Sequence, residues 1–215
     1  MTIRTLDDLS AELDADLAWR KKELSDLKYF IDQAGHSPSR RRALGRCGIT
    51  MLYAHWEGFV KLASRHFLEF VAMQRLQNCQ LVPALLTLSL RSSVRLSPET
   101  RKASELGKVT DFFLTRLSHR AHLPFKVGLD TGSNLSSAVL KEITWCLGVD
   151  YAPFATKEKF IDSRLLGRRN HIAHGKGLDV DPDEFDDMRA AVIDMMDGLK
   201  TEIENSAAQR TYMNA

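Results

Sequence analysis

Apolar side chains recur at spacings of three, four and seven residues through most of this 215-residue chain. In the N-terminal segment the repeat consists of Leu6, Leu9, Leu13, Leu17, Leu24, Leu27 and Ile31. Such spacing gathers apolar groups on one face of an α-helix, whereas a half-buried β-strand needs strict alternation. The pattern therefore predicts a long amphipathic helix that ends near Gly35.

A second long helix is predicted directly after the first. Ser37 and Pro38 supply a cap and a first-turn proline. The apolar stripe then continues to about Gln77 through Ile49, Leu52, Tyr53, Trp56, Phe59, Ala63, Phe67 and Phe70. Gly45 and Gly48 lie inside this segment, where each costs about 1 kcal/mol relative to alanine. We expect them to mark either a kink or a close contact with another helix.

The rest of the chain contains start and stop signals for further helices. Residues 78–97 lack a sustained period and are expected to form loop with short helix. Four more helices are predicted: one opened by Ser97 and Pro98 that runs to His119 and Arg120, one capped by Ser133 or Asn134 and stopped by Gly148, one from Lys157 to Ala173 ended by Gly175, and one started by Asp181 and Pro182.

These elements predict an all-α helical bundle of five to six helices with a long antiparallel N-terminal pair. We expect a single domain over residues 1–205 and a frayed C-terminal tail over residues 206–215. No window is apolar enough to span a membrane, and the acidic, amphipathic start is unlike a secretory leader. A cytoplasmic location is expected, and Cys47, Cys79 and Cys146 are too far apart to suggest a disulfide framework or a zinc ribbon.

Residues 169–174, Arg-Asn-His-Ile-Ala-His, are the local string best suited to chemistry. Arginine keeps its charge at any biological pH and offers a planar fork for phosphate oxygens, while histidine exchanges protons near neutrality. Asn170 and His174 share a helix face. Arg169 and His174 are five residues apart, about 140° around an ideal helix. The long arginine stem and a loosening final turn before Gly175 would help them to converge.

Two alternatives compete with a catalytic role for this string. Arg168 and Arg169 could be surface charges with His174 as a C-terminal cap, because basic residues in a last turn stabilise helices. His171 and His174, three residues apart, could instead be metal ligands. No third ligand stands at regular spacing, since Asp162 and Asp179 lie outside that helical face, and we expect neither a metal nor another cofactor.

The string RLLGRRNHIAHG, which starts at Arg164, resembles the signature of the HEPN superfamily, R-x(4–6)-H with a polar residue after the arginine. It matches the four-residue form through Arg169, Asn170 and His174. Residues 52–61, LYAHWEGFVK, look like the partner helix of stand-alone bacterial HEPN-like nucleases of about this length. The resemblance covers residues 45–75 and 157–200 well and the middle of the chain poorly.

What the resemblance implies is an α-helical homodimer whose two motif helices face each other across a composite active site. Many members are metal-independent endoribonucleases, including toxins and effectors of phage defence. Others have lost the motif and only bind RNA, nucleotide or protein, and that is the alternative function here. By the resemblance Arg169 and His174 would be catalytic, with Asn170 orienting them or the phosphate. RNA and a possible antitoxin or partner protein are the implied partners, without a membrane.

Other residues could support such a site. Glu57 could pair with Arg168 or Arg169 and hold the guanidinium toward the cleft, or be a plain surface carboxylate. His171 and Lys176 could contact RNA or be solvated, and Arg40–Arg42 could extend an RNA track. Tyr53, His55 and Trp56 could stack an unpaired base, but at helical spacing aromatic residues are more often core or dimer interface.

Overall fold

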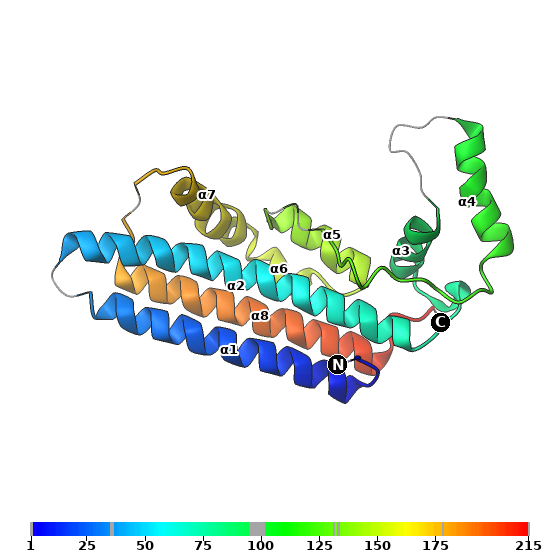
Figure 1. The fold of residues 1–215 in the computed structure, drawn as a ribbon, viewed down its shortest axis with the longest axis horizontal. Coiled ribbons are helices and arrows are strands. Elements are labelled where there is room, and N and C mark those ends of the chain that lie inside the picture. The colour runs from blue at the N-terminus through cyan, green and yellow to red at the C-terminus, as the bar shows by residue number, and fades with distance from the viewer. Residues whose placement is uncertain are drawn as a thin grey trace.

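Three long helices form the frame of the molecule in the computed structural model, which describes residues 2–34, 37–94, 102–130, 132, 134–177 and 179–214. They are α1 (Leu6–Asp32), α2 (Pro38–Met73) and α8 (Pro182–Gln209). All three lie side by side, with α1 and α2 antiparallel (Figure 1). Their apolar faces meet in a core that includes Leu13, Trp56, Phe59, Phe185 and Leu199.

Short-range signals fix where the long helices begin. Thr5 forms a capping box with Asp8 at the start of α1. Ser37 caps α2 ahead of Pro38, as predicted, and Asp181 caps α8. In each case a side-chain oxygen accepts a backbone N–H that the first turn leaves without a partner.

Gly45 and Gly48 mark a close helix contact. A Cβ on Gly48 would lie 2.6 Å from Cε2 of Phe185 on α8, and one on Gly45 would lie 2.9 Å from Cβ of Val180. The absence of side chains at these two positions lets the start of α8 approach α2. Of the two outcomes expected for this glycine pair, the structure has the close approach.

Shorter helices cover one side of this frame. They are η1 (Asn78–Gln80), α3 (Pro83–Ser93), α4 (Ala103–Thr115), α5 (Ser137–Leu147), α6 (Ala152–Ala155), the π-helix η2 (Phe160–Gly167) and α7 (Arg168–Ala173). α5, η2 and α7 contact α2, whereas α4 stands away from the three long helices (Figure 1). The described residues thus contain eight α-helices and no strand, which confirms the all-α class.

Several predicted boundaries differ from the structure. Residues 83–93 form a full helix where loop with short helix was expected. The cap of α5 is Ser136, whose hydroxyl accepts from the Val139 N–H at 3.2 Å, rather than Asn134. Gly148 ends α5 with a left-handed φ of 67°, as predicted. Gly35, Ser97, Pro98 and Ser133, named in other predictions, lie outside the described residues.

The prediction of a frayed tail over residues 206–215 is wrong. α8 continues to Gln209, and Tyr212 is buried against the rings of Phe67 and Phe70. A β-bridge joins Met213 to Leu81. One aromatic ring gives this polar segment an apolar anchor.

Candidate active site

Arg169 is held against α2 by an aromatic ring. Its Cζ lies 4.0 Å from the ring centroid of Tyr53, and its Nη2 donates to Oδ1 of Asn134 at 3.2 Å. Tyr53 is itself fixed, because its hydroxyl accepts the Leu135 N–H at 2.6 Å in the core. A ring stacked on a guanidinium covers one face of it. The N–H groups point outward in the plane of the guanidinium, where they can donate to the oxygens of an anion.

Burial and two nearby charges set the ionisation of Tyr53. Burial raises the pKa of the phenol above its ordinary value, and the charge of Glu57 acts in the same direction. The Leu135 N–H and the Arg169 guanidinium oppose this increase. The phenol therefore stays neutral at physiological pH, and it serves Arg169 as a polarised ring rather than as a counterion.

Arg168 points to a different helix. Its Nη2 donates to Oε1 of Glu184 on α8, and Nη2 of Arg164 approaches the same oxygen at 3.4 Å. The hydrogen bond from Arg168 is the main reason that the pKa of Glu184 is lowered. The structure thus uses Arg168 to tie α7 to α8.

Backbone groups close the end of α7. The Lys176 N–H donates to the His171 carbonyl at 3.1 Å, and the Gly175 N–H donates to the Ile172 carbonyl at 3.0 Å. Gly175 has a φ of 74°, so the left-handed residue predicted at this end is present. This pair of bonds is the Schellman arrangement. Because backbone donors already occupy these carbonyls, the imidazole of His174 is not needed to cap them.

The predicted site residues on the C-terminal side of Arg169 differ in exposure. Asn170 is half-buried, and its carbonyl accepts the His174 N–H at 3.0 Å. His171, His174 and Lys176 are exposed. Arg169 therefore faces α2, while His174 lies in solvent at the helix end.

The helix before the motif is not the α-helix predicted for Lys157–Ala173. Residues Phe160–Gly167 form a π-helix, and α-helical geometry resumes at Arg168. Both carboxylate oxygens of Asp162 bind Ser137, accepting its N–H at 2.7 Å and its hydroxyl at 2.6 Å. This wider stretch is thus bonded to the first turn of α5. π-helical turns are rare and are found frequently at functional sites.

Comparison with known proteins identifies the family. The model of the MAE_28990-like HEPN family matches residues 9–212. The chain belongs to this HEPN family. No curated protein and no solved structure matches it.

Glu57 has a basic partner on its own helix in this HEPN protein. Its Oε1 lies 2.9 Å from Nζ of Lys61, one turn along α2. The expected alternative partner Arg168 is engaged with Glu184 instead. Glu57 still bears on the motif, because its charge acts on Tyr53 beneath Arg169.

The aromatic residues of α2 belong to the core. Tyr53, His55 and Trp56 are all buried, so the core reading of this trio is correct within the chain. Nε2 of His55 lies 2.9 Å from a Glu23 carboxylate oxygen, and Nη1 of Arg20 donates to the His55 carbonyl at 3.2 Å. Burial is the main cause of a lowered pKa at His55.

Sequence reasoning missed three partners of the motif, namely Tyr53 as the support of Arg169, Asn134 as its acceptor and Glu184 as the acid of Arg168. Tyr53 had a usable signal, since it falls in the segment that resembles the HEPN partner helix. Asn134 and Glu184 had none, because their pairing depends on how the helices pack.

The first turns of α2 lie next to the segment that follows α7. Arg42 and Arg46 line a cavity of about 420 Å³ together with Gly177 and Asp179. Nε of Arg42 lies 3.7 Å from Oδ1 of Asp179. Arg42, one of the residues predicted to extend an RNA track, thus lies next to the segment that follows the motif.

Two further features are absent from the described residues. These residues contain no group of three or more His, Cys, Asp or Glu side chains arranged to hold a metal ion. Nor does any helix in them combine the length and the apolar character that crossing a membrane requires.

Proposed function

We propose that this HEPN protein is a metal-independent endoribonuclease that cleaves single-stranded or loop RNA, and that it acts as a toxin or phage-defence effector. Arg169, Asn170 and His174 carry the reaction. The observation that supports this most is the fixed stacking of Arg169 on Tyr53, with an exposed His174 whose helix end is already capped by backbone. An arginine and a histidine kept for stability alone would need neither arrangement.

The proposed reaction is an attack of a ribose 2′-hydroxyl on the adjacent phosphate. A base takes the hydroxyl proton, the 2′-oxygen bonds to phosphorus, and the bond from phosphorus to the 5′-oxygen breaks as that oxygen receives a proton. His174 exchanges these protons, and Arg169 stabilises the negative charge on the phosphorane oxygens. The products are a 2′,3′-cyclic phosphate and a 5′-hydroxyl, and DNA survives because it lacks the nucleophile.

A homodimer with a composite site solves the geometric problem within one chain. Arg169 faces α2 while His174 is exposed at the end of α7, so one protomer does not present the pair as a unit. In a two-fold pair of motif helices, Arg169 of one protomer can meet His174 of its partner over one phosphate.

Cleavage of labelled RNA in EDTA tests the proposed activity. We expect wild-type protein to cleave RNA but not DNA of the same sequence, and His174→Ala to lose cleavage without a change in melting temperature. His171→Ala is the matched control in the same helical turn, and it should retain cleavage. Equal loss in both histidine variants, with inhibition by EDTA, would instead support a metal site. No cleavage of any RNA would leave the binding-module alternative.

Mixing two inactive variants tests the composite site. If sites pair Arg169 of one protomer with His174 of its partner, a heterodimer of Arg169→Ala and His174→Ala contains one intact site of two. Random exchange of subunits then restores about a quarter of the wild-type sites. If both residues of a site come from the same protomer, the mixture stays inactive.

A further inference from the structure

A cavity with a strongly basic lining lies along the part of α2 that follows Tyr53. It measures about 630 Å³, and its charged lining residues are Arg20, Lys61, Arg65, Lys126 and Asp130. We call it the basic cavity. Four cations against one carboxylate make it a candidate site for an anion.

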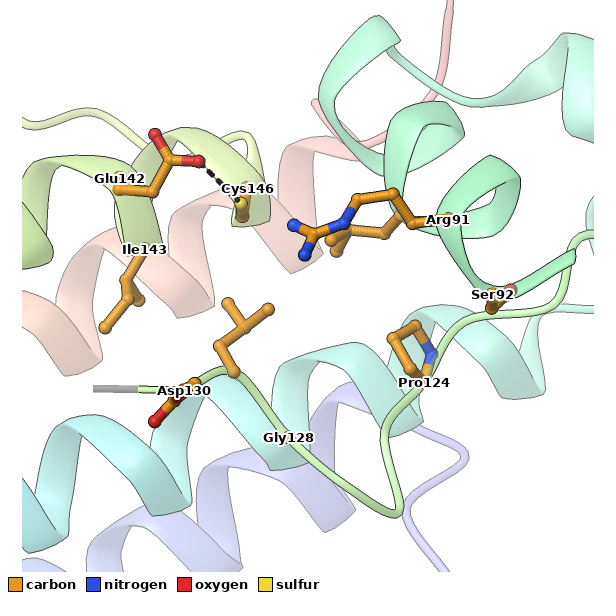
Figure 2. Close-up of a pocket in the computed structure, with 10 residues that line it drawn as sticks. Arg91, Ser92, Pro124, Gly128, Asp130, Glu142, Ile143 and Cys146 are labelled. Atoms are coloured by element: carbon orange, nitrogen blue, oxygen red, sulfur yellow. Dashed lines mark hydrogen bonds between the residues drawn. The ribbon is translucent and has the colours of Figure 1, made fainter. Parts of the chain in front are cut away.

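The neighbouring cavity provides a contrast. Figure 2 shows a cavity of about 410 Å³ with Arg91, Glu142 and Cys146 around it and Asp130 at its edge. Its one cation faces two carboxylates, and burial with Glu142 raises the pKa of the Cys146 thiol to about 11. An anion gains nothing there. The basic cavity, on the other side of the segment that contains Gly128, has the opposite charge balance.

The cations of the basic cavity are not equally available. Arg20 is buried and paired with Asp16, and Lys61 is paired with Glu57. Arg65 and Lys126 are exposed, and no carboxylate among the described residues lies within ion-pair distance of either. Gly58 leaves the wall open, because a Cβ there would lie 2.9 Å from Nη1 of Arg20. A ligand therefore meets two unpaired cations at the rim and a guanidinium below.

The basic cavity lies along the same helix, α2, whose Tyr53 supports Arg169. Tyr53, Glu57, Lys61 and Arg65 follow each other at four-residue spacing, which forms one ridge of α2. Lys61 lies about 12 Å and Arg65 about 18 Å along the helix from Tyr53. The segment that supplies Lys126 to the cavity also supplies Asn134 to Arg169. Lys61 and Arg65 thus lie beyond Glu57 on the ridge of α2 that begins beneath Arg169.

We propose that the basic cavity binds backbone phosphates of the single-stranded RNA that occupies the motif, at positions beyond the scissile linkage. This inference rests on the proposed function for its ligand. Arg65 and Lys126 contact the phosphates, and Arg20 and Lys61 add to the local positive field. Each contact releases counterions from the strand, so binding depends on salt and not on base sequence.

Equilibrium binding tests this proposal without cleavage. A fluorescein-labelled oligouridylate is titrated with His174→Ala protein between about 50 and 200 mM salt. Adding Arg65→Ala and Lys126→Ala should reduce the slope of log affinity against log salt by about 1.4 and weaken binding about fifteenfold near 0.15 M salt. Arg4→Ala with Lys22→Ala is the matched control, since both are exposed and neither lines the cavity.

The outcomes separate this inference from the proposed activity. Equal slopes for the cavity pair and the control pair would overturn the phosphate site, even if inorganic pyrophosphate bound there. A reduced slope for the cavity pair alone, with unchanged melting temperature, supports it. Failure of the wild-type protein to cleave RNA would refute the nuclease and leave the binding result standing. If both proposals hold, the cavity pair raises KM for long RNA and leaves kcat unchanged.

Discussion

Substitution of Tyr53 separates the support of Arg169 from the stability of the fold. Tyr53→Phe keeps the ring beneath the guanidinium and removes the acceptor of the buried Leu135 N–H, which costs about 1 to 3 kcal/mol of stability. Tyr53→Leu removes the same acceptor and the ring as well. A cation over a ring in a half-buried setting is worth about 1 to 2 kcal/mol. If that energy holds Arg169 in place for the reaction, its loss lowers kcat about 5- to 30-fold.

Two measurements on the same proteins check this reasoning. Urea unfolding should show both variants destabilised, while single-turnover cleavage of RNA should be much slower in Tyr53→Leu than in Tyr53→Phe. Rescue by the aromatic variant is a result that a merely structural role would not give. Equal cleavage rates in the two variants would refute the idea that the ring positions Arg169.

Three further predictions concern the frame around the motif. Glu184→Gln removes a carboxylate whose pKa is lowered by Arg168, so wild type should be more stable than the variant above about pH 4.5 by less than about 1 kcal/mol. That difference in stability should vanish as the pH falls through the lowered pKa that Glu184 has in the folded protein. Urea unfolding of both proteins above and below that pKa checks this. Gly175→Ala places a side chain at a φ of 74° and should cost about 1 to 2 kcal/mol in thermal unfolding. Gly48→Ala forces a Cβ against Phe185 and should destabilise the protein by about 1 to 3 kcal/mol, and an unchanged melting temperature would contradict the close contact.

Local patterns were sufficient for most of the fold. The three long helices follow from apolar spacing, and Ser37, Asp181, Gly148 and Gly175 act where their side-chain or backbone chemistry predicts. The packed tail was missed because Tyr212 is a single aromatic residue in a polar segment, and its partners are far away in the sequence. Residues that pack by tertiary contact leave little trace in periodicity.

The site was predictable in its residues and not in its contacts. The motif string supplied Arg169 and His174, and Gly175 supplied the end of the helix. Which arginine faces α2 and which faces α8 depends on the rotation of α7, and η2 sets that rotation. No spacing rule signals a π-helix, so the sequence did not show that Arg168 and Arg169 contact different helices.

The π-helical stretch also determines the rotation of the following helix, α7, about its own axis. Its i to i+5 bonding fits more residues into each turn than an α-helix does, so the length of 160–167 determines the direction in which α7 starts. Deleting the exposed Ser163 would leave α7 helical but turn it by roughly 100°. This one deletion would therefore break both the contact of Arg168 with Glu184 and that of Arg169 with Tyr53. The orientation of both guanidiniums is thus encoded in a segment that contains neither of them.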